Sequence, residues 1–300
     1  MQKITPNLWC DGNAREMADF YLSIFPSSKI TGGSKYPANA SEGLADFQLE
    51  LAGKDLTIDL KLAGHDFTLI NAGPEFKPTA ANSFFVNFNS KEDPEARQHL
   101  EHVWEKLAEG GAVLMELQKY PFSDYYGWVQ DKYGYSWQLM LLEPQVEFAC
   151  IMPGLLFANG VQNKAQEALE FYSSVFKGSQ VGYVSKYQED TGPAKADVSV
   201  AYGDVELAPR EWFAVMDSGI EQNVTFNEAV SYVITCKDQQ EVDYFWEKLS
   251  SVSESEQCGW CKDRYGVSWQ IVPENMGELM QKPNAFKTLM SQHKIVIAEY

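Results

Sequence analysis

The strongest constraint on the fold of this 300-residue chain is that its sequence repeats itself. Four segments return in the same order: FYLSIF (20–25) as FYSSVF (171–176), SKY (34–36) at 185–187, WEKL (104–107) at 246–249, and GWVQDKYGYSWQL (127–139) as GWCKDRYGVSWQI (259–271). A period this long indicates two globular domains, because solenoid repeats are about 20–50 residues long. We predict domains at 1–145 and 150–282, followed by a tail at 283–300.

Each copy mixes helices with a larger number of strands. Apolar residues at three- and four-residue spacing predict helices at 13–25 and 92–109. The strands predicted in the first copy are 3–10, 29–36, 44–52, 56–62, 84–88, 113–117 and 136–142. Helices this sparse favour an α+β fold with antiparallel sheet over a doubly wound parallel one. Each copy is expected to hold two βαβββ units, with loop insertions at 64–76 and 119–126.

Composition excludes several classes of function. The chain has 24 Lys and Arg against 42 Asp and Glu, a formal charge of −18, which repels nucleic acids and anionic lipid. No stretch approaches the roughly 18–20 apolar residues that span a bilayer. The first residues lack the pattern of a signal peptide, and five cysteines at low density fit a reducing cytoplasm. We therefore expect a cytoplasmic protein that binds neither membranes nor nucleic acids.

Several segments resemble the PhnB-like family, whose members often carry the label 3-demethylubiquinone-9 3-methyltransferase. These are ITPNLW (4–9), FYLSIF (20–25), VSYVITCKDQQEVDYFWEKL (230–249) and CGWCKDRYGVSWQIVP (258–273). That family belongs to the vicinal oxygen chelate (glyoxalase/bleomycin resistance/dioxygenase) superfamily. The resemblance covers nearly the whole chain, once per domain. It implies that paired βαβββ units form a curved, open cup of sheet around a small molecule.

The superfamily's usual metal ligands are replaced in this sequence. The resemblance implies a Glu seven residues after the Asp of an Asp-x-x-Gly turn, but Gln138 and Gln270 stand there. No His stands at the other ligand positions, which fall near 5–7 and 152–154 and at 82–83 and 230–231. A neutral amide is a poor metal ligand without stronger partners. The sequence therefore predicts no bound metal and no cofactor, and no glycine-rich loop supports a methyl-donor site.

The repeated turn motif supplies the candidate ligand-binding residues. They are Gln138, Gln270, Trp137, Trp269, Trp128 and Trp260, with Tyr36 and Tyr187 of the repeated SKY as further candidates. An amide both donates and accepts hydrogen bonds, which suits a neutral polar ligand. The alternative is structural: the turn forms a hairpin, Trp packs in the core and Gln bonds to backbone. Strand alternation places Trp137 and Gln138 on opposite faces, so both should not line one cavity.

Two other motifs are interpreted as unrelated to function. The pair Cys258 and Cys261 precedes a turn and a strand rather than a helix, so a redox role is disfavoured. His99 and His102 lie among charged residues and indicate a surface pair.

Three functions remain open. The favoured one is a metal-independent protein that binds a small molecule, flat or apolar with a polar group. The first alternative is an enzyme, a methyltransferase or a lyase or isomerase, with catalytic residues unknown and Asp59, Asp131 or Asp263 as the base. The second is a structural protein that dimerises through sheet edges. The chain is expected to be a monomer with internal domain pairing or a homodimer.

Overall fold

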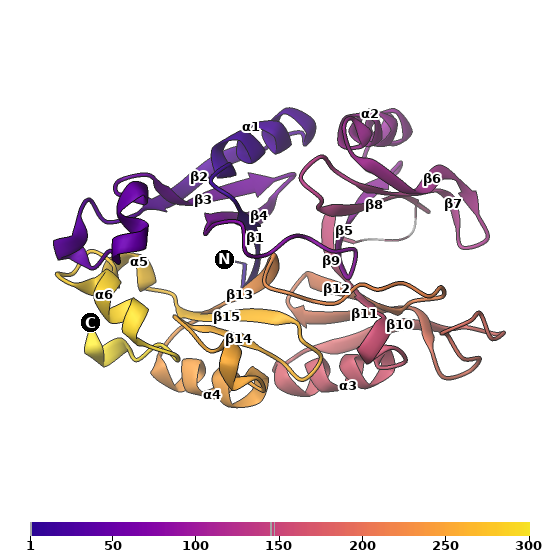
Figure 1. Ribbon diagram of the computed structural model, residues 1–300. Coiled ribbons are helices and arrows are strands. Elements are labelled where there is room, and N and C mark those ends of the chain that lie inside the picture. The colour runs from indigo at the N-terminus through magenta and orange to yellow at the C-terminus, as the bar shows by residue number, and fades with distance from the viewer. Residues whose placement is uncertain (1, 145, 147) are drawn as a thin grey trace.

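The structure is a computed structural model that describes residues 2–144, 146 and 148–300 (Figure 1). Sheet A contains, in spatial order, β14 (Trp260–Lys262), β15 (Ser268–Pro273), β13 (Val230–Cys236), β1 (Ile4–Cys10), β4 (His65–Asn71), β3 (Asp55–Leu62) and β2 (Lys29–Lys35). Sheet B contains β10 (Gln180–Lys186), β11 (Val200–Ala208), β12 (Glu211–Asp217), β9 (Ile151–Phe157), β5 (Asn82–Asn89), β8 (Ser136–Leu142), β7 (Ser123–Gln130) and β6 (Ala112–Tyr120).

Four longer helices flank these sheets. They are α1 (Ala14–Ile24), α2 (Ala96–Ala108), α3 (Ala165–Val175) and α4 (Gln239–Leu249). The short helical elements are η1 (Ala40–Glu42), η2 (Asp46–Leu51), η3 (Asn159–Val161), η4 (Ser253–Ser255), α5 (Met276–Leu279), α6 (Ala285–Ser291) and η5 (Ile297–Glu299). Two open sheets with few helices confirm the predicted α+β class, but the sheets are mixed rather than antiparallel, since β1 runs parallel to β4 and β9 to β12. Within the described residues, no helix combines the length and apolarity needed to cross a membrane.

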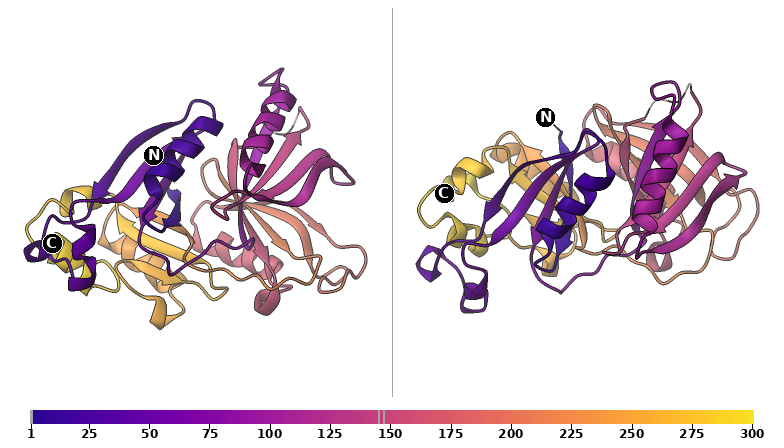
Figure 2. Two further views of the ribbon diagram at one scale, coloured as in Figure 1. Left: turned by 45° about the horizontal axis from the view of Figure 1, so that its top comes forward. Right: turned by 90° about the horizontal axis from the view of Figure 1, so that it is seen from above.

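The sheets divide the chain differently from the sequence repeat. Sheet A joins the first βαβββ unit to the fourth, through the antiparallel pair β1 and β13 with Asn7 opposite Ser231. Sheet B joins the second unit to the third, through the antiparallel pair β5 and β9 with Ser83 opposite Gly154. Figure 2 accordingly shows the N-terminal and C-terminal segments on the same side of the molecule. Each sheet is therefore completed within one chain.

One core holds the two sheets together. Leu8 and Tyr232 of sheet A belong to the same buried cluster as Phe84 and Phe157 of sheet B, together with the apolar faces of the helices. Strand alternation turns the other face of each sheet away from this core. We call these the inner faces. They open toward opposite ends of the molecule, and η1, η2, α5 and α6 lie at the sheet A end (Figure 1).

Three expectations from the sequence were wrong in this part of the fold. The predicted strand 44–52 contains the 3₁₀ helix η2, because Leu44 leaves the sheet to pack with Tyr36 and with Phe286 of α6. The segment 64–76, predicted as a loop insertion, contains strand β4, in which Phe67 and Leu69 are buried at alternate positions. The segment 119–126, also predicted as an insertion, contains the end of β6 and the start of β7.

Candidate ligand-binding site

The aspartate of the first repeated turn is buried in the core. Asp131 lies between β7 and β8 and accepts hydrogen bonds from two backbone N–H groups of its own turn, at 2.9 and 3.0 Å. It also accepts bonds of 2.8 Å from the Tyr21 hydroxyl on α1 and from the Trp137 indole. Burial raises the pKa of Asp131, and these four donors act in the opposite direction. All four donors are protein groups, so the carboxylate acts as a structural anchor.

The second turn repeats this arrangement. Asp263 accepts bonds from two backbone N–H groups, from the Tyr172 hydroxyl at 2.8 Å and from the Trp269 indole at 2.9 Å. Trp137 and Trp269, which the sequence offers as ligand-binding residues, are wholly buried in the core with their N–H groups already bonded. We therefore leave them out of the candidate site.

A row of polar side chains crosses the inner face of sheet A. The row contains one residue from each of six neighbouring strands: Asp59 (β3), Thr68 (β4), Asn7 (β1), Ser231 (β13), Ser268 (β15) and Lys262 (β14). We call it the polar row. Neighbouring strands lie about 4.8 Å apart, so its three central residues span roughly 10 Å, the size of a small molecule. Asn7, Ser231 and Ser268 are each no more than 3% exposed.

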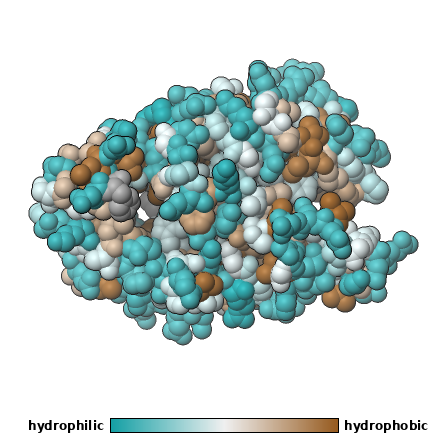
Figure 3. Space-filling model, in the orientation of Figure 1, coloured by the Kyte–Doolittle hydropathy of each residue, from teal (hydrophilic) through white to brown (hydrophobic). Residues whose placement is uncertain are grey.

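Sheet B carries a counterpart row on the equivalent strands. Its members are Asp204 (β11), Ala214 (β12), Gly154 (β9), Ser83 (β5), Ser136 (β8) and Gln130 (β7). Three positions match by residue type, but Thr68 and Asn7 are replaced by Ala214 and Gly154. Apolar side chains surround this row, among them Met152 and Phe85. On the outer surface, apolar side chains appear toward both ends of the molecule in the space-filling view (Figure 3).

The counterpart row satisfies its own hydrogen bonds. Gln138 donates to the Ser83 hydroxyl at 2.8 Å and accepts a short bond of 2.5 Å from the Tyr126 hydroxyl. The Trp128 indole donates to Ser136 Oγ at 2.6 Å. Two residues of the predicted site, Gln138 and Trp128, therefore lie on the inner face of sheet B, but their bonds are made within the protein.

The polar row of sheet A is not satisfied in this way. Gln270 donates to Ser231 Oγ at 2.9 Å, as its counterpart does in sheet B. Across the described residues, however, five buried side-chain oxygens have no hydrogen-bond partner, and three of them lie at this row. These are Asn7 Oδ1, Ser268 Oγ and Oε2 of Glu228, whose Oε1 lies 2.8 Å from Lys262 Nζ. We call these three the open polar atoms.

Two tryptophans lie across the row. Trp9 follows Asn7 by two residues on β1, whereas Trp260 pairs with Gln270, on the opposite side of the row. Their ring centroids are nevertheless only 5.9 Å apart, so the rings meet above the intervening strands β13 and β15. Trp9 is held by a 2.6 Å bond from its indole to the Gly73 carbonyl. The tryptophan pair thus lies over the two strands that carry Ser231 and Ser268.

The ends of the row carry charge. Asp59 accepts a 2.9 Å bond from the Thr68 hydroxyl, and burial raises the pKa of its carboxyl. At the other end, Lys262 and Glu228 form an ion pair whose side chains are 21% and 16% exposed. A pair this enclosed is screened less by solvent than a surface pair.

The remaining predicted site residues lie away from the row. The Tyr36 hydroxyl donates to the Asn71 carbonyl at 2.6 Å, and its ring packs on Phe286. The Tyr187 hydroxyl donates to the Asp217 carbonyl at 3.2 Å. Both tyrosines therefore use their hydroxyl groups to fasten loops.

The donor set does not fit the divalent metal implied by the fold. The central polar row offers two hydroxyl groups and one amide, with the Gln270 amide beside them. Neutral oxygens of this kind hold such a cation weakly, and the one carboxylate beside them, that of Glu228, already pairs with Lys262. No group of three or more His, Cys, Asp or Glu side chains suited to a metal occurs within the part of the chain that the structure describes.

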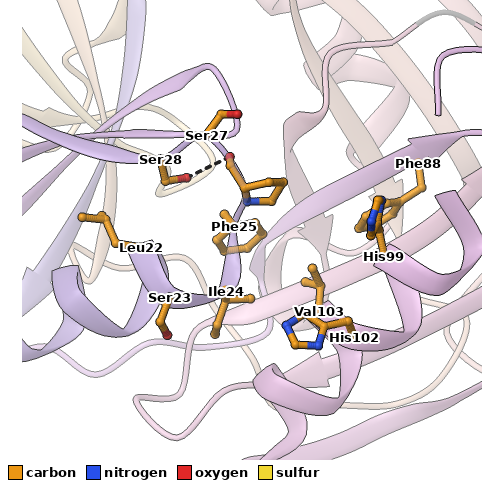
Figure 4. Close-up of a pocket in the computed structure, with 11 residues that line it drawn as sticks. Leu22, Ser23, Ile24, Phe25, Ser27, Ser28, Phe88, His99, His102 and Val103 are labelled. Atoms are coloured by element: carbon orange, nitrogen blue, oxygen red, sulfur yellow. Dashed lines mark hydrogen bonds between the residues drawn. The ribbon is translucent and has the colours of Figure 1, made fainter. Parts of the chain in front are cut away.

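The other two sequence motifs lie outside this site. Cys258 is half-buried beside Met290, Cys261 is buried in the core, and all five cysteines are free thiols. His99 and His102 line a groove of about 390 Å³ between α2 and the end of α1 (Figure 4). His99 is bonded to Asp93 at its rim.

Sequence reasoning located the site only in part. It placed Asn7 and Ser231 among the positions at which the family resemblance implies metal ligands, and it named Gln270, which lies beside the row. It missed Ser268, Lys262 and Glu228, because their convergence depends on pairing between the first and fourth units. The signal available in the sequence was the difference between Asn7 and its counterpart Gly154 at equivalent positions of the repeat.

Comparisons with known proteins give the class of the fold. The match to glyoxalase I from Zea mays covers 97% of this chain and 98% of that protein, with 9% sequence identity and a TM-score of 0.53. A putative dioxygenase from Bacillus subtilis covers 97% and 91%, with 10% identity and a TM-score of 0.50. At such identities these likenesses concern the fold alone. Together with the paired βαβββ units, they show that the chain has a glyoxalase-like fold.

A family model identifies the chain more specifically than the likeness in fold does. The family model described as 3-demethylubiquinone-9 3-methyltransferase matches residues 2–140 and again 149–272, and the chain belongs to this family. A putative 3-demethylubiquinone-9 3-methyltransferase, PhnB protein, from Bacillus cereus is 37% identical over 47% of this chain and all of its own, with a TM-score of 0.38. No curated protein matches the chain.

Proposed function

We propose that this protein binds a small polar molecule on the inner face of sheet A, without a metal ion. The observation that carries the proposal is the gathering of the three open polar atoms at one row. A buried polar group without a partner costs about 1–3 kcal/mol, so three at one place indicate groups that a ligand satisfies. The counterpart row in sheet B, with its bonds closed internally, supports a division of roles between the two sheets.

The chemistry of the row supports binding more than catalysis. Asp131 and Asp263, the two candidate bases of the repeated turns, are engaged by four protein donors each. Asp59 remains the one acid of the row, and it lies at the end away from the open polar atoms. The family description gives methyl transfer as the alternative, with S-adenosylmethionine as the compound that tests it.

The test begins with native mass spectrometry of freshly purified protein, followed by the denatured mass of the same sample. A co-purified small molecule without metal is the expected difference, and a single chain is the expected assembly because both sheets are completed internally. One divalent metal per sheet overturns the metal-independent proposal. A stable dimer favours the structural alternative.

A ligand screen by thermal shift then locates the site. Compounds that stabilise the wild-type protein are expected to lose most of that effect with Asn7→Gly, which copies the counterpart Gly154, and with Ser268→Ala. The matched control is Ser83→Ala in sheet B, which should leave the ligand-induced shift unchanged. If the shifts survive both row variants and disappear with the control, the site lies in sheet B and the proposal fails.

A further inference from the structure

The chemistry of the open polar atoms narrows the class of ligand, an inference that rests on the proposed function. A carboxylate oxygen accepts hydrogen bonds and donates none, so Glu228 Oε2 requires a donor from the ligand. Asn7 Oδ1 is an acceptor as well. The Ser268 hydroxyl serves in either direction. Two of the three open polar atoms therefore require an N–H or O–H donor on the ligand.

The charged groups beside the open polar atoms also favour a ligand that donates hydrogen bonds. Lys262 is the cation of the row, and its ammonium group lies 2.8 Å from Glu228 Oε1. Its charge is therefore already balanced, and the second oxygen of the same carboxylate stays open. At the far end, Asp59 adds a carboxylate that is held by the hydroxyl of Thr68. The row and Glu228 together carry two carboxylates against one ammonium group, which favours a cationic ligand over an anionic one.

The covering rings add a requirement of shape. Trp9 and Trp260 meet edge to face above β13 and β15, and Phe76 packs on Trp9 with ring centroids 4.9 Å apart. A flat ligand can stack against such rings, and a cation near an aromatic face gains further attraction. We propose that the ligand of sheet A is a flat, cationic, N–H-rich molecule of the amidine class.

Three probes of nearly identical shape test this proposal. Benzamidine presents N–H donors and a positive charge, benzamide is neutral, and benzoate presents acceptors and a negative charge. Isothermal titration calorimetry with the full-length protein should give benzamidine the highest affinity, at least about tenfold above benzoate. Equal or tighter binding of benzoate, or no binding of benzamidine at millimolar concentration, overturns the ligand class.

Variants place the probe at the row. Glu228→Gln and Asn7→Gly are each expected to weaken benzamidine binding about tenfold or more, and Ser136→Ala in sheet B to leave it unchanged. Glu228→Gln keeps the size of the side chain. If Glu228→Gln does not fold, Asn7→Gly provides the test in its place. Unchanged affinity in both row variants refutes the inference. If benzamidine fails while other screened compounds still depend on Asn7 and Ser268, the ligand class is wrong and the proposed function stands.

Discussion

Asn7 and Gly154 occupy equivalent positions of the two sheets, but Asn7 adds a polar side chain to its inner face and Gly154 adds none. Each lies on the strand that joins two βαβββ units, opposite a serine of the neighbouring strand, Ser231 or Ser83. Asn7 contributes one of the open polar atoms, whereas Gly154 leaves room for the Ser83 hydroxyl and the Phe85 ring. The inner face of sheet A is therefore polar at this position, whereas neighbouring side chains fill the same position on the inner face of sheet B.

Adding a side chain at position 154 should destabilise the protein. A Cβ atom there would lie 2.7 Å from Ser83 Oγ and 2.9 Å from Phe85 Cε2, closer than van der Waals contact allows. We expect Gly154→Ala to reduce the free energy of unfolding by about 1–3 kcal/mol, measured by urea denaturation. Gly160→Ala is the control, because a Cβ atom at that position meets no described atom within 4 Å. Equal stability of the two variants would show that the inner face of sheet B can relax.

The bond between Tyr21 and Asp131 should contribute strongly to stability. It joins α1 to the turn of the second unit, it is 2.8 Å long and both groups are buried. Tyr21→Phe removes one donor from a buried carboxylate, so we expect a loss of about 1.5–3 kcal/mol in chemical denaturation. Tyr133→Phe provides the control, since its hydroxyl donates to Glu16 at the exposed surface and should be worth less than about 1 kcal/mol.

His65 should make stability depend on pH. Burial at the start of β4 lowers the pKa of its imidazole to about 4, from the usual value near 6.5. The folded state therefore favours the neutral ring. Its contribution is complete above about pH 6.5 and is lost as the pH falls toward about 4. Compared with His65→Gln, the wild-type protein should lose about 2 kcal/mol more between about pH 7.5 and 5 in parallel denaturation curves. Parallel pH profiles for the two proteins would contradict a partly buried histidine that is held neutral by the fold.

The sequence predicted the repeat, the fold class and the family, because these depend on local periodicity and on residues close together in the chain. Strand alternation was enough to separate Trp137 from Gln138. The polar row was beyond reach, because it requires the register between β1 and β13, more than 220 residues apart. The predicted strand at 44–52 was wrong for a similar reason, since Leu44 packs against a helix from the other end of the chain.

Ser268 and Ser136 provide the most direct comparison of the two sheets. Both serines are almost fully buried at matching positions of the repeated motif. Ser136 accepts a bond from the Trp128 indole, whereas Ser268 Oγ is an open polar atom. Ser136→Ala leaves the partly buried Trp128 indole without its acceptor and should cost about 1–3 kcal/mol. Ser268→Ala removes a desolvated hydroxyl and should leave the ligand-free protein as stable as the wild type, or more stable by about 1 kcal/mol.

The same pair distinguishes a binding site from an ordinary core position. A hydroxyl retained for binding does not stabilise the ligand-free fold, so Ser268→Ala should keep or gain stability while losing the ligand-induced rise in melting temperature. Ser136→Ala should show the reverse, with lower stability and an unchanged ligand effect. Both quantities come from thermal denaturation of the two variants with and without a ligand found in the screen. If Ser268→Ala is destabilised as much as Ser136→Ala, its hydroxyl is satisfied in the ligand-free protein, and the polar row loses the feature that sets it apart from its counterpart.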